Sequence, residues 1–139
     1  MSGYMVEDEP GPEEGLVAFN DGQAEAENRK PLGVFVHRNN EVVGGVDGYT
    51  HWKWLFVSHL WVADDLRGLG VGSHLMATIE ARGRLRGCHG AWLDTFGFQA
   101  PGFYQSIGYQ QFGELPDFPP GSRRHFLWKR LESPTEPTY

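Results

Sequence analysis

Three glycines at alternate positions mark the segment Arg67–Gly72 (RGLGVG), the first part of this sequence that suggests chemistry. Residues that lack a Cβ let the backbone approach a ligand closely. Where such a turn opens a helix, free N–H groups and the helix dipole favour an anion. We therefore expect a phosphate or a pyrophosphate to bind here. A tight strand-to-helix turn that binds nothing is the simpler alternative.

The pattern differs from two well-known phosphate-binding loops. It is not a Walker loop, because no Gly-Lys-Ser/Thr follows the glycines. It is not the dinucleotide fingerprint G-x-G-x-x-G either, since Gly68 and Gly70 fit its first two glycines but Ser73 stands at the third. A second feature of the sequence is needed before a ligand can be named.

Two motifs, in order along the chain, resemble the GNAT superfamily of N-acetyltransferases. Arg67, Gly70 and Gly72 match the [QR]-x-x-G-x-[GA] signature of that family. Ala100–Tyr109 (APGFYQSIGY) is similar to the A-x-x-[LF]-Y-x-x-x-G-[FY] pattern on its last helix. The likeness covers roughly residues 31–131, and the first thirty residues match less well. It implies an α/β (α+β) fold with a mixed, mostly antiparallel, splayed central sheet flanked by helices.

The resemblance also implies how acetyl-CoA binds. Backbone N–H groups of the glycine turn would hold the pyrophosphate, Arg67 would add charge, and the edge of the preceding strand would hydrogen-bond the pantetheine arm. An Asn that the family often has falls on Gly97 here, and Gln99 is the substitute. The expected cofactor-binding residues are Leu60, Trp61, Val62, Arg67, Gly68, Leu69, Gly70, Val71, Gly72, Ser73 and Gln99.

Attack of an amine on a thioester needs proton transfers. An amine with a lysine-like pKa of about 10.4 is almost wholly protonated at pH 7, so a base must take its proton, directly or through water. Tyr104 stands where the family motif has its catalytic tyrosine, and a phenol can protonate the departing thiolate. Packing in the core beside Phe103, with a hydrogen-bonded hydroxyl, is the alternative for this tyrosine.

The base is less clearly marked. Some family members carry a glutamate on the central strand, but Trp54–Val62 (WLFVSHLWV) has no carboxylate. Asp94 ends a predicted buried strand and is the candidate base, with a hydrogen bond to nearby backbone as its alternative role. His59 is of the residue type that titrates near neutral pH. Strand alternation groups it with Val57 and Trp61, on the face away from the acetyl group. A water chain without a dedicated base also fits.

These residues require a frame of strands and helices. Trp54–Val62 is nearly all apolar, which predicts a central strand buried on both faces. A short strand at Tyr4–Val6 and helical turns within Glu13–Asn20 are also expected. The other predicted strands are Pro31–Arg38, Glu41–Tyr49, Ala91–Thr95, Tyr109–Leu115 and His125–Leu131, and the predicted helices are Val71–Arg86 and Pro101–Ile107.

Length and composition limit the classes of protein. The 139 residues predict one domain, residues 1–131, and the proline-containing tail 132–139 is expected to be disordered. The single Cys88 excludes an internal disulfide and a cysteine-based zinc site, and the six scattered histidines lack metal-binding spacing. There is no apolar run long enough to cross a membrane and no secretory signal, so we expect a cytoplasmic protein with no membrane partner.

The charge distribution bears on the partner. The net charge of -6 argues against nucleic acid. Eight acidic residues and no Lys or Arg precede Arg29, a field that would attract a cationic substrate, although a solvated surface explains it as well.

The sequence thus predicts an acetyl-CoA-dependent N-acetyltransferase that acts on a primary amine, most simply a small cationic molecule. A non-catalytic acyl-CoA-binding regulator of the same fold and a module that binds another nucleotide are the alternatives. The surplus of aromatic residues leaves a homodimer open.

Overall fold

The computed structural model describes residues 29–97 and 101–132, which build a mixed sheet of six strands in the order β1-β2-β3-β4-β6-β5. β3 and β4 run parallel, and the other neighbouring pairs are antiparallel, as predicted. The strands are β1 (Lys30–Arg38), β2 (Glu41–His51), β3 (Trp54–Val62), β4 (Gly90–Phe96), β5 (Gln110–Pro116) and β6 (Arg123–Arg130).

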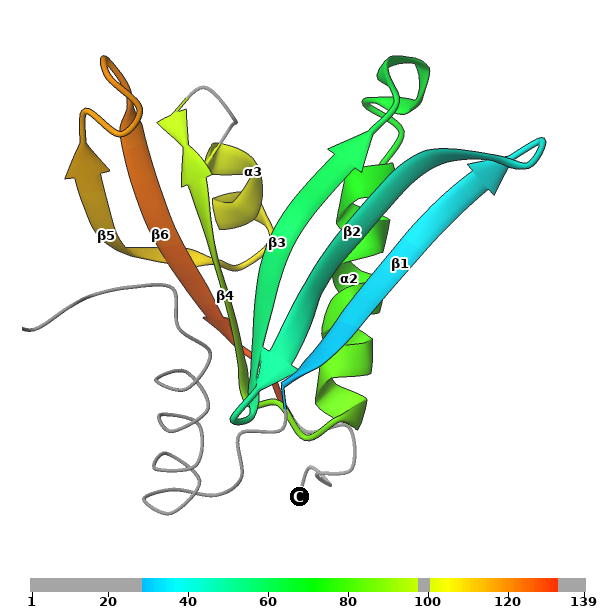
Figure 1. The fold of residues 1–139 in the computed structure, drawn as a ribbon, viewed down its shortest axis with the longest axis horizontal. Helices are drawn as coiled ribbons and strands as arrows, with labels where there is room; N and C mark the ends of the chain where they lie inside the picture. Colours follow the sequence, from blue (N-terminus) through cyan, green and yellow to red (C-terminus); the bar gives the residue numbers. More distant parts are fainter. Residues whose placement is uncertain (1–28, 98–100, 133–139) are drawn as a thin grey trace, which may run out of the picture.

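The two central parallel strands pair over a short distance and then separate. Their ladder runs from Trp54–Gly90 to Phe56–Trp92. Beyond these pairs β3 and β4 diverge, so the sheet opens like a V (Figure 1). The edge of β3 after Phe56 therefore faces the opening, and its backbone is available to a ligand. This is the splayed sheet that the sequence predicts.

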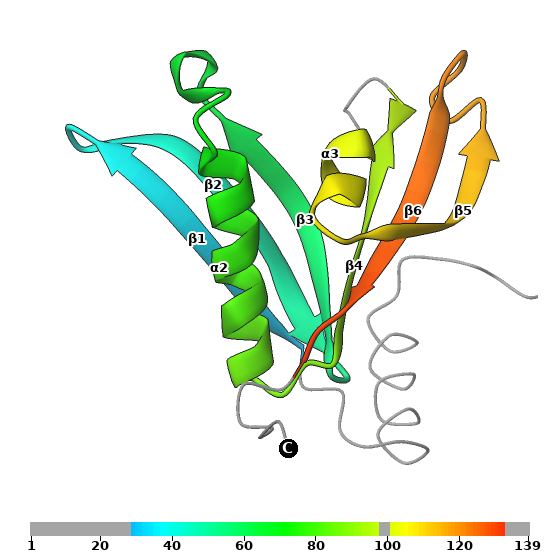
Figure 2. The same cartoon turned by 180° about the vertical axis from the view of Figure 1, so that it is seen from behind.

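Two helices lie on the same face of the sheet, which is turned to the viewer in Figure 2: α2 (Val71–Leu85) lies in front of β1–β3, and α3 (Pro101–Ser106) lies beside β4. The 3₁₀ helix η1 (Asp64–Leu66) precedes the glycine turn. α2 buries Leu75, Met76 and Ile79 against the strands, because these residues share one side of the helix. It ends at Leu85 and is followed by Gly87 with φ of 88°, a common way to terminate a helix.

A β-bulge in β3 exchanges the faces of the sheet to which the side chains after Val57 project. Asp47 pairs with His59 and Gly48 pairs with Val57, so Ser58 is an extra residue between them. Val57 is buried, and Leu60 packs against the same core, whereas His59 is exposed. A Cβ at position 48 would collide with the carbonyl oxygen of Phe56, so the bulge requires glycine there.

Two sequence predictions for β3 were wrong, and the bulge explains the first of them. Simple alternation places Val57 and His59 on one face, but the extra residue puts them on opposite faces. The strand is central in the sheet, yet it is not buried on both faces. Its first half is buried on the helix side, and its second half borders the opening between β3 and β4.

A buried polar network ties α2 to the segment that follows α3. The Glu80 carboxylate on α2 accepts a hydrogen bond from the hydroxyl of Tyr109 at 2.8 Å and one from Nζ of Lys129 at 2.9 Å. Burial and the Glu80 carboxylate raise the pKa of Tyr109. The backbone N–H of Tyr109 donates to the carbonyl of Tyr104 at 3.0 Å, so this network also holds α3 in place.

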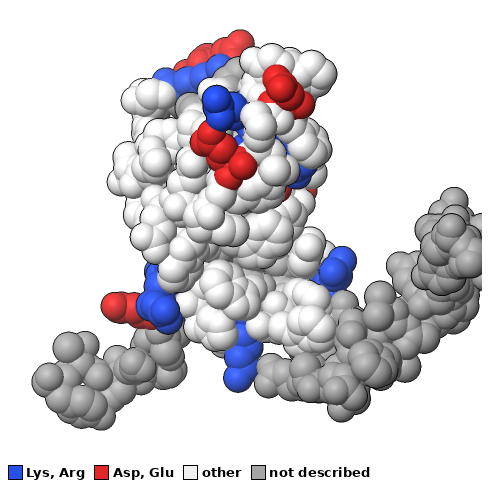
Figure 3. All heavy atoms as spheres, turned by 90° about the vertical axis from the view of Figure 1, so that its left-hand side faces the viewer, with Lys and Arg blue, Asp and Glu red and all other residues white. Residues whose placement is uncertain are grey.

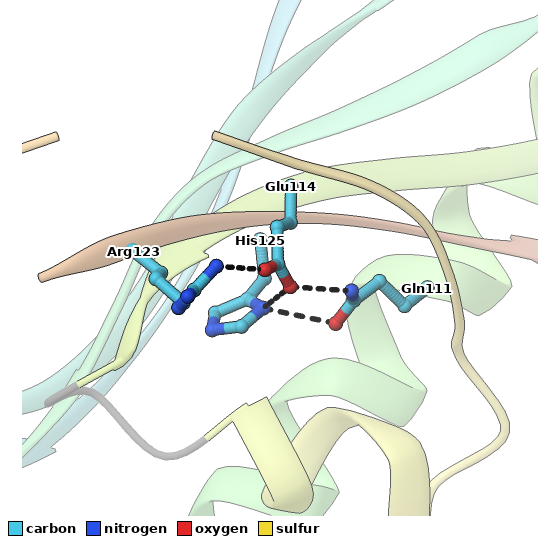
Figure 4. A network of polar contacts seen from close by, with 4 residues as sticks. All are labelled: Gln111, Glu114, Arg123 and His125. Atoms are coloured by element: carbon cyan, nitrogen blue, oxygen red, sulfur yellow. Dashed lines mark hydrogen bonds and ion pairs between the residues drawn. The ribbon is translucent and has the colours of Figure 1, made fainter. Parts of the chain in front are cut away.

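The hairpin of β5 and β6 forms the other edge of the sheet. Glu114 contacts both Arg123 and His125, and Gln111 completes the network on the helix side of the sheet (Figure 4). Seen from this edge, charged side chains lie mostly towards the two ends, with a broad uncharged area between them (Figure 3). Phe112 of β5 is exposed at this edge. Whether a second copy of the chain covers it is not tested, so the homodimer stays a prediction.

Most element boundaries agree with the sequence within two residues. The turn Asn39-Asn40 has the positive φ angles expected of it, 54° and 67°. The strand expected at Tyr4–Val6, the helical turns within Glu13–Asn20 and the tail from residue 133 onward lie outside the described residues. The single domain over residues 1–131 stays a prediction.

Candidate active site

Most of the predicted cofactor residues surround one cavity of about 520 Å³ at the N-terminus of α2. Two of the eleven predicted cofactor-binding residues do not line this cavity. Leu69 projects to solvent, and Gln99 lies outside the described residues. Phe103 and Tyr104 of α3 close the opposite side of this cavity. The predicted residues that line it are Leu60, Trp61, Val62, Arg67, Gly68, Gly70, Val71, Gly72 and Ser73.

The glycine turn has the backbone geometry of an anion site. Gly68 and Gly70 have φ of 78° and 81°, which disfavours any residue with a Cβ. The first hydrogen bond of α2 runs from the N–H of His74 to the carbonyl of Gly70 at 3.0 Å. The N–H groups of Val71, Gly72 and Ser73 therefore have no partner within the helix and open to the cavity. This arrangement fits a pyrophosphate.

Arg67 lies beside this turn and is held by local contacts. Its Nε donates to the carbonyl of Val62 at 3.4 Å, and its Nη2 lies 3.3 Å from the carboxylate of Asp64. The first contact joins the turn to the end of β3. The guanidinium thus stays at the rim of the cavity, where it adds positive charge next to the expected pyrophosphate.

Tyr104 lines this cavity from α3 and packs edge-on against Phe103 and Tyr109, with ring centroids 5.1 Å and 6.1 Å away. Burial raises its pKa, so the phenol keeps its proton at neutral pH. Within the described residues its hydroxyl has no hydrogen-bond partner. The tyrosine is thus a packed aromatic whose hydroxyl keeps its proton and is not engaged by another described residue.

A second cavity, of about 530 Å³, adjoins the first between β3 and β4. Leu60, Trp61 and Tyr104 line both, so the two cavities meet between β3 and Tyr104 of α3. The second cavity is also lined by Asp47, Ser58, His59, Asp94 and Thr95. One side of Tyr104 therefore faces the glycine turn, and the other faces a group of polar side chains.

Asp94 stands in this second cavity, as the sequence suggested, but it has a permanent cationic partner. Nε and Nη2 of Arg124 both lie 3.0 Å from its Oδ1. The guanidinium also stacks on the ring of Phe118 at 4.7 Å. A side-chain ion pair thus stands where the sequence suggested a backbone hydrogen bond. The role of Asp94 as a base stays a prediction.

Sequence reasoning missed Asp47. Its Oδ1 lies 2.9 Å from Nδ1 of His59, across the β2–β3 ladder. No local pattern marks Asp47, because its partner is twelve residues away and the bulge sets their register. The sequence showed only that an Asp lies on the strand before a strand that contains a His. The strand register is needed to show that the two side chains meet.

Comparisons with known proteins agree with this geometry. A model of the acetyltransferase (GNAT) family matches residues 4–109. The chain belongs to the GNAT family of acetyltransferases. It is 45% identical over 107 residues to the blasticidin-S acetyltransferase of Streptomyces morookaense, which covers 73% of this chain and 79% of that protein.

Solved GNAT structures share the fold. An acetyltransferase from Bacillus cereus superposes with a TM-score of 0.84 at 29% identity, and covers 94% of this chain and 100% of its own. A Bacillus anthracis protein solved in complex with acetyl coenzyme A has a TM-score of 0.65 at 17% identity, and covers 73% of this chain and 63% of its own. The second likeness shows the fold alone.

Membership of the GNAT family confirms two sequence predictions, the fold class and the enzyme class. Acetyl-CoA is the acyl donor of this family. In the part of the chain that the structure describes, no helix is long and apolar enough to span a membrane. Over the same residues, no group of three or more His, Cys, Asp or Glu side chains is placed to hold a metal ion.

Proposed function

We propose that this protein transfers the acetyl group of acetyl-CoA to a primary amine of a small molecule. The observation that carries the proposal is the junction of the two cavities at Tyr104. One cavity has a helix N-terminus and left-handed glycines suited to a pyrophosphate, and the other has polar and acidic side chains suited to an amine.

Residues of the first cavity would bind and orient the donor. The N–H groups of Val71–Ser73 hold the pyrophosphate, and Arg67 adds charge at the rim. The open edge of β3 at Leu60–Val62 aligns the pantetheine arm through backbone hydrogen bonds. Acetyl-CoA, when bound, supplies an acetyl group activated as a thioester.

Tyr104 is the proposed proton donor. The amine nitrogen forms a bond to the acetyl carbon as the carbon–sulfur bond breaks, and the hydroxyl of Tyr104 gives its proton to the sulfur. The phenolate regains a proton through water from the nitrogen that has become an amide. The raised pKa of Tyr104 keeps the donor loaded before each turnover.

The second cavity favours a cationic acceptor. Asp47 and Asp94 both line it. Arg124 balances the charge of Asp94, so Asp47, which faces His59, is the carboxylate that attracts a protonated amine. Because the chain is 45% identical to a blasticidin-S acetyltransferase, blasticidin S is the first acceptor to test. The class of small amine-bearing antibiotics follows as the proposed range of substrates.

The test has two readings. Thermal unfolding with acetyl-CoA at about a hundredfold excess over Kd should show a stabilisation of about 2.7 kcal/mol, or roughly 5–10 °C, with no comparable shift from ATP or NAD. Release of free CoA with blasticidin S should then exceed the rate without an amine. Binding without release to any amine of a panel would favour the non-catalytic regulator, and a shift with ATP or NAD would favour another nucleotide.

Two further proposals concern the state of the protein. A cytoplasmic location is proposed because the one cysteine, Cys88, forms no internal disulfide and burial raises the pKa of its thiol. A homodimer is proposed from the exposed apolar residues of β5. Light scattering at several concentrations checks it, and a persistent mass of 15.7 kDa would exclude it.

A further inference from the structure

We propose that His59, oriented by Asp47, is the group that takes the proton from the acceptor amine. This inference rests on the proposed function and concerns the second cavity, which both residues line. It assigns the base of the reaction to β3, and it gives Asp47 on β2 a positioning role.

The contact between the two side chains defines the state of the imidazole. Nδ1 of His59 lies 2.9 Å from Oδ1 of Asp47. A carboxylate only accepts, so Nδ1 carries the proton and donates it, and the lone pair of the neutral ring is on Nε2. Among residues 29–97 and 101–132, no other side chain or backbone group hydrogen-bonds this ring. Nε2 therefore has no partner among the described residues, and in the neutral ring it carries the lone pair.

The position of the ring suits a substrate that enters from solvent. His59 is exposed, and it lines both the second cavity and a shallower groove of about 440 Å³ on the outer face of β1–β3. The ring stands where the two hollows meet. Asp47 faces it from β2, Asp94 from β4 and Tyr104 from α3, and these are the titratable groups that border the second cavity with it.

The bulge at Ser58 makes this placement possible. With simple alternation, His59 would project to the helix side with Val57, away from Asp47 and the outer groove. The extra residue turns it to the outer face, while Leu60 and Val62 return to the core. Bulges commonly redirect a side chain in this way next to an active site.

Asp94 is the competing candidate, and its surroundings suit it less. Its carboxylate lies in an ion pair with Arg124, whose guanidinium does not give up its proton in proteins. Nε and Nη2 of the guanidinium both contact Oδ1, so this oxygen is already engaged and is not open to a proton of the amine. The Asp47–His59 pair differs because only Nδ1 of the ring contacts the carboxylate, and the ring has a second nitrogen, Nε2, that no described residue hydrogen-bonds.

The proton transfers balance. The N–H bond of the ammonium breaks, its proton moves to Nε2 of His59, directly or through one water, and the electron pair stays on the nitrogen. That nitrogen bonds to the acetyl carbon as the carbon–sulfur bond breaks. Tyr104 protonates the sulfur and regains a proton from the second N–H through water. His59 finally releases its proton to solvent.

The first experiment compares four variants: His59→Gln, Asp47→Asn, Asp94→Asn and the control His37→Gln. His37 is also an exposed strand histidine, but it lines neither cavity. We expect His59→Gln to lower kcat about 100-fold or more with blasticidin S. Asp47→Asn should lower it about tenfold, Asp94→Asn should lower it less than His59→Gln does, and the control His37→Gln should change it less than about threefold. The Kd of acetyl-CoA should stay unchanged in all four.

Two readouts separate a base from a structural residue. Between about pH 7 and pH 9.5, kcat/KM of His59→Gln should rise about tenfold per pH unit, because the amine then loses its proton without help. The wild type should rise much less. Nitrogen NMR of the imidazole, without ligand, should show the Nδ1–H tautomer of His59 in the wild type and a mixture of tautomers in Asp47→Asn.

Each outcome decides something. Loss of activity and rescue by alkaline pH in Asp94→Asn, but not in His59→Gln, would make Asp94 the base and overturn the proposal. Unchanged activity in both Asp94→Asn and His59→Gln would indicate proton removal through a water chain, and would also overturn the proposal. A wild type that binds acetyl-CoA but acetylates no amine would overturn the proposed function, and with it the need for a base. Active wild type with unchanged His59→Gln would overturn the His59 assignment alone.

Discussion

The two sides of the opening between β3 and β4 each carry a carboxylate paired with a nitrogen base, at almost the same distance. Asp47 lies 2.9 Å from His59, and Asp94 lies 3.0 Å from Arg124. The side chains of His59 and Asp47 are 76% and 45% exposed, whereas those of Arg124 and Asp94 are 27% and 16% exposed. Distance alone therefore does not distinguish a proton-transfer pair from a structural one; exposure and the chemistry of the nitrogen do.

A second histidine sharpens the comparison. His125 also lies near a carboxylate, 3.7 Å from Glu114, but its side chain is only 14% exposed. Its Nδ1 contacts Gln111 at 2.9 Å, and Arg123 contacts the same carboxylate (Figure 4). The partners of His125 are thus shared within a network on β5 and β6. This histidine holds a hairpin together, whereas His59 borders a cavity.

The largest expected effect concerns the residue that both cavities share. Tyr104→Phe keeps the ring packing and removes the hydroxyl, so it should lower kcat about 100-fold while the Kd of acetyl-CoA changes less than about twofold. Steady-state kinetics and calorimetric titration measure the two quantities. Equal kcat for the variant and the wild type would show that Tyr104 is a core aromatic and no proton donor.

The next effect is on the structural side of the opening. Arg124→Met leaves the part-buried carboxylate of Asp94 without its partner and removes the stacking on Phe118, so unfolding should need about 2 kcal/mol less. Urea denaturation measures this. The double variant Arg124→Met/Asp94→Asn is the control, because it removes the uncompensated charge and should recover part of the loss. No difference between wild type and Arg124→Met would remove the structural role.

A smaller effect depends on pH. Because the pKa of Tyr109 is raised, the folded protein keeps this proton at a pH where the unfolded chain, with an ordinary tyrosine pKa near 10, loses it. Stability should therefore fall as the pH rises above about 10. Tyr109→Phe should be less stable at neutral pH, since Glu80 loses a hydrogen bond, but should lose less on going to alkaline pH. Urea denaturation at neutral pH and above about pH 10 gives the change in the free energy of unfolding for the wild type and for Tyr109→Phe. Equal changes in the two proteins would contradict a raised pKa of Tyr109.

The smallest effect is on the proton-transfer side. Asp47→Asn should change the free energy of unfolding by less than about 0.5 kcal/mol, because ion pairs between exposed groups contribute little. The same urea experiment gives the value. A loss comparable to that of Arg124→Met would mean that both sides of the opening are structural, and the contrast between them would disappear.

The site could be predicted from the sequence where it depends on local geometry. The left-handed φ of Gly68 and Gly70, the start of α2 and its end before Gly87 follow from residues that lie next to one another. Tyr104 was predicted from a motif on a single short helix. These features need few long-range contacts, so the pattern of neighbouring residues was enough to locate them.

The partners across the sheet were decided by the tertiary structure. Arg124 reaches Asp94 because β6 pairs with β4, thirty residues further along the chain. His59 reaches Asp47 because one extra residue at Ser58 shifts the β2–β3 register. Alternation in a strand has a period of two, so a single inserted residue exchanges the faces, and nothing in the local sequence announces it. The sequence by itself determined the glycine turn, the elements and the family; the folded sheet decided which carboxylate meets an imidazole and which meets a guanidinium.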